Sequence, residues 1–150
     1  MRGAIEQGYK AALKAGDKRR TATLRAISAA VKDRDIEARG HGKDPLSDAD
    51  ILVLLQKMVK QREESLGIYA QAGREDLATV EREEIAILTE FLPQPMSEAE
   101  VEAAIIDAIR KTGASDARDM GKVIASLRAD HPGRIDFGKA SAKIKTALGS

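Results

Sequence analysis

The sequence predicts an all-α protein, with a helical N-terminal domain and a small three-helix C-terminal domain. Apolar residues recur with the 3.6-residue period of amphipathic helices, whereas alternating β-branched runs and Asn-Gly or Asp-Gly hairpin turns are missing. The 150 residues include two Tyr, two Phe and no Trp. We therefore expect a core of Leu, Ile, Val and Ala, and a chain of this length buries about 68–70% of its unfolded surface.

The N-terminal domain is expected over residues 1–93. Its four predicted helices cover residues 2–14, 17–38, 47–72 and 75–92. Asp17 and Ser47 are residue types that cap a helix start, because their side-chain oxygens accept hydrogen bonds from free backbone N–H groups. Gly16 and Gly73 stand where glycine commonly ends a helix, because glycine adopts the left-handed backbone conformation without strain.

Pro93 and Pro95 mark the domain boundary, because each proline ring removes a backbone N–H and cannot continue a helix. The C-terminal domain is expected over residues 96–150. Ser97 and Glu100 form a capping box at the start of its first helix. Two short helices are expected after it, over residues 119–129 and 137–148.

Charge is distributed unevenly, although the net charge is only +1. Residues 1–34 carry nine Lys or Arg against three acids, and residues 118–150 carry seven against three. Residues 75–102 carry nine acids and one Arg. This asymmetry indicates a polyanion-binding surface beside an acidic one, or two surfaces that face each other, or ordinary solvated helix faces.

Basic residues at regular spacing are the candidates for RNA binding. They are Lys122, Arg134, Lys139, Lys143, Lys18, Arg25 and Lys32. Lys18, Arg25 and Lys32 recur every seven residues, which stacks them along one side of the second predicted helix. Lys139 and Lys143 are four residues apart in the last helix, where like charges cost an isolated helix about 0.2–0.5 kcal/mol. Together these residues suit contact with phosphate groups.

No residue pattern predicts a catalytic, cofactor or metal site. Cysteine is absent, and neither of the two histidines has a second ligand at metal-binding spacing. Phosphate-loop, dinucleotide-binding and nucleophile-elbow motifs are missing. Glu64, Glu81 and Glu84 could approach one another for acid–base work or metal binding. We expect instead that Arg62 pairs with one of these glutamates.

The location predicted from the sequence is the cytoplasm. The first residues are charged and helix-patterned, without the apolar segment of a signal peptide, and no aliphatic run is long enough to cross a membrane. The lack of cysteine fits a reducing compartment. We therefore expect a soluble cytoplasmic protein without membrane association.

Several stretches of the chain resemble the YqeY family. They are TLRAISAAVK (23–32), KMVKQREES (57–65), YAQAGREDLATVEREEI (69–85), FLPQPMSEAEVE (91–102) and DMGKVIASL (119–127), with Gly133, Arg134 and the Ile144-Lys145 ending. The resemblance runs from the first predicted helix to the last residues. The combination of motifs is specific, whereas a single one would be weak.

The YqeY family is similar, chiefly in its C-terminal part, to the tail of the B subunit of the glutamine-dependent amidotransferase that converts Glu-tRNA(Gln) or Asp-tRNA(Asn) to the amide. In that enzyme the tail contacts the tRNA body, and the chemistry lies elsewhere. The resemblance implies two helical domains, with tRNA contact by Gly121-Lys122, Arg134 and the helix bearing Lys139 and Lys143. The larger B-subunit domain that binds ATP, metal and the acceptor end has no counterpart here. Carbon-nitrogen ligase activity with glutamine as amide donor is therefore a matter of kinship, and we do not expect it from the isolated chain.

Three functions remain open at this point. The first is a tRNA or structured-RNA binding accessory protein that contacts RNA by shape and phosphate, because few aromatic rings are free to stack on bases. The second is a non-catalytic component or modulator of an aminoacyl-tRNA amidotransferase, with that enzyme or another translation-related protein as partner. The third is a protein-interaction adaptor that docks through the acidic residues 75–102. None of the three requires a cofactor or a metal.

Overall fold

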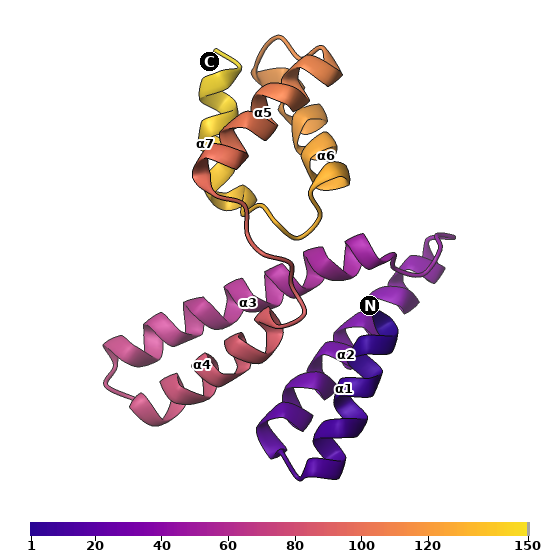
Figure 1. Ribbon diagram of the computed structural model, residues 1–150, viewed down its shortest axis with the longest axis vertical. Coiled ribbons are helices and arrows are strands. Elements are labelled where there is room, and N and C mark those ends of the chain that lie inside the picture. The colour runs from indigo at the N-terminus through magenta and orange to yellow at the C-terminus, as the bar shows by residue number, and fades with distance from the viewer. Residues whose placement is uncertain (150) are drawn as a thin grey trace. The chain divides into compact units, whose positions relative to one another are not determined.

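The computed structural model describes residues 1–149 as seven α-helices and one short 3-10 helix, with no strand in that range (Figure 1). The chain divides into two compact units, residues 1–92 and 93–150, called here the N-terminal unit and the C-terminal unit. The all-α prediction is confirmed. The last residue of the predicted C-terminal domain, Ser150, lies outside the described residues. Within the described range, no helix combines the length and the apolar character needed to span a bilayer.

The helices of each unit follow in chain order. The N-terminal unit contains α1 (Arg2–Ala15), α2 (Lys18–Gly40), α3 (Asp48–Gln71) and α4 (Glu75–Thr89). The C-terminal unit contains α5 (Glu98–Thr112), the 3-10 helix (Ala117–Asp119), α6 (Met120–Asp130) and α7 (Phe137–Ala147).

Side-chain caps start the helices where the sequence predicts them. Asp17 accepts a hydrogen bond from the Arg20 N–H at 3.0 Å, at the start of α2. At the start of α5, Ser97 Oγ accepts from the Glu100 N–H at 3.1 Å, and the Glu100 carboxylate accepts from the Ser97 N–H at 3.0 Å. Ser47 forms the same kind of capping box at α3. These bonds satisfy N–H groups that a helix start leaves without intrahelical partners.

The structure differs from the predicted helices mainly at three places. The helix α2 extends to Gly40, two residues beyond its predicted end. The helix α4 ends at Thr89, three residues before its predicted end, and Phe91 and Leu92 continue as single turns. Pro93 explains the early end, because a proline disfavours helical geometry in the residue before it. The 3-10 helix before α6 was not predicted. It forms where the Asp116 carboxylate accepts a hydrogen bond from the Arg118 N–H at 2.9 Å.

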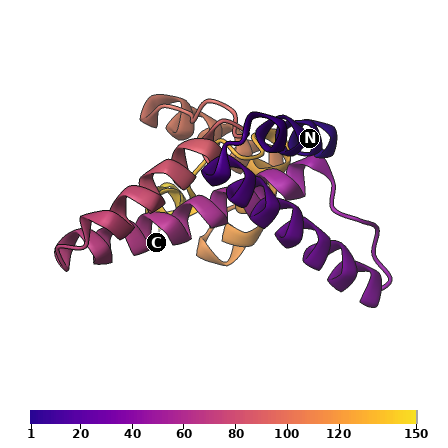
Figure 2. The same cartoon turned by 90° about the horizontal axis from the view of Figure 1, so that it is seen from below.

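The N-terminal unit consists of two helical hairpins that meet at α2. The pairs α1/α2 and α3/α4 each run side by side in both views (Figures 1 and 2), and α2 also packs against α3 and α4. Leu24, Ile27 and Val31 form a buried apolar stripe along α2. It lies in a core made of Ile5, Ala12, Leu24, Ile27, Val31, Ile51, Leu55, Met58 and Leu88.

The C-terminal unit has a separate core, to which each of its three α-helices contributes. The buried residues are Ile105, Ala108, Val123, Leu127, Ile135, Ala140, Ile144 and Leu148. A backbone hydrogen bond of 3.1 Å from the Met96 N–H to the Arg134 carbonyl joins the segment before α5 to the loop between α6 and α7. The three helices are therefore held together at the end where the unit begins.

An ion pair joins three segments of the N-terminal unit. Two nitrogens of the Arg2 guanidinium each donate to a different carboxylate oxygen of Asp35 at 2.8 Å, and the Leu46 N–H donates to the same carboxylate at 2.9 Å. These bonds lower the pKa of Asp35 from 3.8 to about 2, the Arg2 hydrogen bond being the largest cause. The start of α1, the last turns of α2 and the segment before α3 are thus tied to one carboxylate.

We expect Ser97→Ala to lower the unfolding free energy of the C-terminal unit by about 1 kcal/mol, because the replacement leaves the Glu100 N–H without its cap. Hydrogen exchange of the α5 amides measures this change. Ser28→Ala is the control, because Ser28 is exposed within α2 and caps no helix. It should change the stability by less than about 0.5 kcal/mol. Equal protection of α5 in wild type and Ser97→Ala would contradict the prediction.

We expect Asp35→Asn to destabilise the protein at neutral pH, and the difference from wild type to shrink in acid. The folded-state pKa of Asp35 is lowered, so its stabilisation is present above the ordinary value of 3.8 and is lost as the pH falls through 3.8 toward about 2. Thermal unfolding followed by circular dichroism between pH 7 and pH 2 measures the difference. Asp33→Asn should show no such dependence, because Asp33 makes no ion pair with any described residue. A difference that grows in acid would disprove the assignment.

Candidate nucleic-acid interface

Two of the candidate RNA-binding residues lie on α7, where Lys139 is exposed and Lys143 is half-buried, with 36% of its side chain exposed. Lys139 and Lys143 lie one turn apart on the last helix, which begins behind the Asp136 cap. Lys143 Nζ lies 3.6 Å from a carboxylate oxygen of Glu102 on α5, whose side chain is 64% exposed. Lys139 makes no ion pair with any residue from 1 to 149. One of the two charges is therefore uncompensated, and the other is weakly paired in water.

Arg134 has a structural role in the loop before α7. Its Nε donates to the Gln94 carbonyl oxygen at 2.9 Å, and a terminal nitrogen lies 3.8 Å from Glu100. Its backbone carbonyl accepts from the Met96 N–H at 3.1 Å. The side chain is 33% exposed. Arg134 therefore binds the segment that leads into α5, and only part of its guanidinium faces solvent.

Lys122 lies in the first turn of α6 and pairs with an acid beside it. Its Nζ is 3.6 Å from Asp119. The Ser115 N–H donates to the Asp119 carboxylate at 2.9 Å, and this bond is the largest cause of the lowered pKa of Asp119. The start of α6 thus carries a negative charge of its own, which reduces its attraction for an anion.

Arg128 joins this group, although the sequence showed only that it is basic. Its guanidinium carbon lies 5.0 Å from the centre of the Phe137 ring, in cation–π contact. The contact connects the last turn of α6 to the first residue of α7. The spacing of Arg128 and Phe137 in the sequence gives no sign of it, because the loop between the two helices decides which residues meet.

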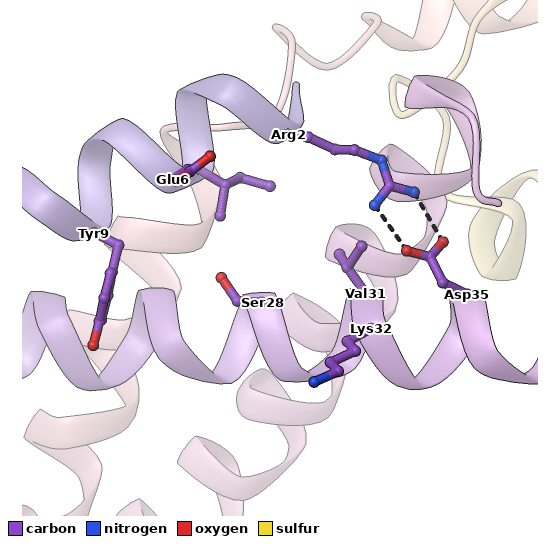
Figure 3. A pocket seen from close by; sticks show the side chains of 8 residues that line it. Arg2, Glu6, Tyr9, Ser28, Val31, Lys32 and Asp35 are labelled. Atoms are coloured by element: carbon purple, nitrogen blue, oxygen red, sulfur yellow. Dashed lines mark hydrogen bonds and ion pairs between the residues drawn. The ribbon is translucent and has the colours of Figure 1, made fainter.

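The three remaining candidates are on α2 and belong to the N-terminal unit. Lys18 and Arg25 line one hollow between α1 and α2, and Lys32 lines a second. Arg25 donates to the Tyr9 hydroxyl at 3.2 Å, with its guanidinium carbon 5.7 Å from the ring centre. Arg25 lines one hollow and Tyr9 lines the other, so this pair lies between the two hollows, which together we call the α1/α2 groove. Figure 3 shows the hollow of Lys32, between Tyr9 and the Arg2–Asp35 pair.

Two other basic residues of α2 pair with acids of α4 and of the residue that follows it. Arg19 Nε donates to Glu83 at 3.1 Å, and a second Arg19 nitrogen lies 3.8 Å from Glu84. Arg20 donates to Glu90 at 2.5 Å. Basic and acidic stretches of the chain therefore face each other at these positions, which is one of the alternatives that the charge distribution left open.

The glutamates singled out for acid–base work are not brought together as a group. Arg62 donates to Glu84 at 2.7 Å, which confirms the predicted pairing. One carboxylate oxygen of Glu81 is buried without a hydrogen-bond partner, and its pKa is raised, first by burial and then by the charge of Glu84. Glu64 is exposed. Among residues 1–149, no three His, Asp or Glu side chains lie so as to hold a metal ion.

Comparison with known proteins gives the chain a family. The family model described as Yqey-like protein matches residues 2–148. The protein "Altered inheritance of mitochondria protein 41, mitochondrial" of Lachancea thermotolerans is 32% identical over 103 residues, which are 67% of this chain and 54% of the relative. The proteins of the same name from Eremothecium gossypii and Clavispora lusitaniae are 31% and 27% identical, over 69% and 97% of this chain and 56% and 84% of the relatives. The chain thus spans little more than half of the first two relatives.

These names contradict the predicted cytoplasmic location. The relatives are named as mitochondrial proteins. The prediction was wrong because it rested on the absence of cysteine and of an apolar leader, and neither feature distinguishes the cytoplasm from other compartments without disulfides.

The family model matches from the first turn of α1 to the residue after α7. The chain belongs to the YqeY family.

Proposed function

We propose that this chain binds tRNA or another folded RNA through its C-terminal unit, as an accessory protein without a catalytic step of its own. The observation that carries the proposal is the pair of like charges on α7, of which Lys139 is exposed and Lys143 is half-buried. Lys139 lacks an acidic partner in the described chain, and Lys143 has only the exposed Glu102. Two cations one turn apart destabilise a helix slightly, so they suit a surface that meets an anion.

The similarity of the family to the amidotransferase tail supports the same surface. Lys122, Arg134, Lys139 and Lys143 lie in the segments that resemble the tail, and in that enzyme the tail contacts the tRNA body. Lys139 and Lys143 are the proposed main phosphate contacts. Arg134 is proposed to contribute its positive charge at the edge of this surface, while its Nε keeps the hydrogen bond to the Gln94 carbonyl oxygen. Lys122 would first have to exchange Asp119 for a phosphate.

The aromatic residues favour recognition of RNA by shape and phosphate. Tyr9 and Phe91 pack against the core of the N-terminal unit, and Phe137 packs against that of the C-terminal unit with Arg128 on its face. Tyr69 is half-buried. Base-reading proteins need exposed rings on which bases stack. A folded RNA is therefore the better candidate than a single-stranded sequence.

The proposal assigns no chemistry to the glutamates. Glu84 accepts a hydrogen bond from Arg62, and Glu81 lies close enough to feel the charges of both residues. No motif of the sequence supplies a nucleophile for these glutamates to activate. A half-buried pair of this kind is proposed to specify how the helices α3 and α4 pack. The similarity to a carbon-nitrogen ligase therefore supports an RNA partner for this chain, and no ligase reaction is proposed.

Titration with deacylated tRNA at several salt concentrations tests the proposal. If about four phosphates are neutralised, log K should fall against log salt with a slope of roughly −2.8 to −3.6. Replacing Lys139 and Lys143 together by Ala should weaken all tRNAs alike and flatten the slope by about 1.5. Helicity should be unchanged, because Ala is the better helix former.

The matched control is the replacement of Lys57 and Lys60 by Ala, which removes two exposed charges from α3. It should leave both affinity and slope close to wild type. Equal losses in the two double variants would mean non-specific attraction. No binding of tRNA at low salt would reject RNA recognition by the chain.

A further inference from the structure

The α1/α2 groove has an apolar floor. Ile5 and Val31 close the bottom of one hollow and are 4% and 7% exposed. Leu13 lines the other hollow and is 51% exposed. The two hollows measure about 330 and 340 Å³. Apolar walls of this kind are filled by side chains, whereas a sugar-phosphate backbone gains nothing from them.

One rim of the groove is positively charged. Lys18, Arg25 and Lys32 line it from α2. The two acids of the groove are already paired, Asp35 with Arg2 and Glu6 with Lys10. Lys18 and Lys32 make no ion pair with any residue from 1 to 149. The rim therefore offers three positive charges that the fold does not neutralise.

The spacing of these charges specifies the shape of a partner. From Lys18 to Lys32 the helix rises by about 21 Å, with a cation every seven residues. In paired helices, charged residues beside the apolar stripe recur at this interval and meet opposite charges on the neighbouring helix. A helix with acids at the same interval would pair with all three in register.

The helix α2 already pairs with acidic residues on another of its sides. The acidic helix α4 packs against α2, and its Glu83 and the following Glu90 are seven residues apart. They pair with Arg19 and Arg20 at 3.1 and 2.5 Å. The helix α2 thus holds one acidic helix with two adjacent basic residues, which do not have the seven-residue spacing of the groove rim. The α1/α2 groove presents a second row of basic residues and no helix to match.

We propose that the α1/α2 groove binds an acidic amphipathic helix of a partner protein. The apolar side chains of that helix would enter the two hollows beside Leu13 and Val31. Its acids, spaced by seven residues, would pair with the α2 rim, and the incoming helix would complete a three-helix bundle with α1 and α2. This inference is independent of RNA binding and assigns the rim cations to a protein partner.

A synthetic peptide of three heptads tests the proposal, with Leu at positions a and d and Glu at e and g. Repulsion between its glutamates limits pairing of the peptide with itself at neutral pH. Fluorescence anisotropy with the full chain should give a Kd below about 100 µM. The same peptide with Lys in place of Glu should not saturate at about 1 mM.

Groove variants locate the binding. Replacing Lys18 and Lys32 together by Glu should weaken the acidic peptide by at least about tenfold, because attraction becomes repulsion. Leu13→Ser should also weaken binding of the acidic peptide, because it removes an apolar side chain that lines one hollow. The control changes Lys57 and Lys60 on α3 to Glu, which alters the total charge equally and should leave the Kd within about twofold. Circular dichroism and thermal unfolding verify that each variant is folded.

Four results would overturn the inference. The first is an acidic peptide that does not bind at about 1 mM, and the second is an equal loss in the α3 control. The third is tRNA binding that depends on Lys18 and Lys32 while the peptide fails to bind, which would make the groove an RNA site. The fourth is self-association that those two residues control, again without peptide binding, which would make the occupant a second copy. The tRNA titration of the α7 variant remains a separate measurement, so the two proposals can fail independently.

Discussion

Burial of the apolar stripe of α2 holds the N-terminal unit together. Leu24, at the centre of the stripe, is fully buried. Gly8 of α1 faces this residue, and a Cβ at position 8 would make ordinary van der Waals contact, at 3.5 Å, with both Leu24 and Phe91. Ile5 and Ala12 of α1 are buried in the same core. The position of α1, and with it the α1/α2 groove, therefore depends on packing against the stripe of α2.

Five basic residues of the same helix are divided between two neighbours, and this division explains much of the uneven charge of the N-terminal unit. Arg19 and Arg20 are used inside the fold against α4, whereas Lys18, Arg25 and Lys32 remain beside α1. Neighbours in sequence thus have different functions, because successive residues of a helix point about 100° apart. A stretch of basic residues is therefore a poor measure of the charge that a surface offers to a partner.

Structural features could be predicted from the sequence where a residue type commonly makes one kind of local interaction. The caps at Asp17, Ser47 and Ser97 and the pairing of Arg62 with a glutamate are of this kind. The surroundings of the candidate RNA-binding residues were not predictable, because they depend on loops and on neighbouring helices. Nothing near Arg134 in sequence indicates that it binds Gln94, forty residues away. Periodicity likewise placed three cations on one side of α2 but could not show that an apolar groove lies beside them.

The contacts of Arg134 decide how the C-terminal unit should be cut from the chain for separate study. A fragment that starts at the Ser97 capping box would keep every helix of the unit. It would lose the Gln94 carbonyl and the Met96 N–H, both of which bind Arg134. The freed guanidinium would then be available to any polyanion, and such a fragment would overstate the affinity of the intact protein for RNA. A fragment that starts at Pro93 keeps both partners and preserves the charge that the unit presents.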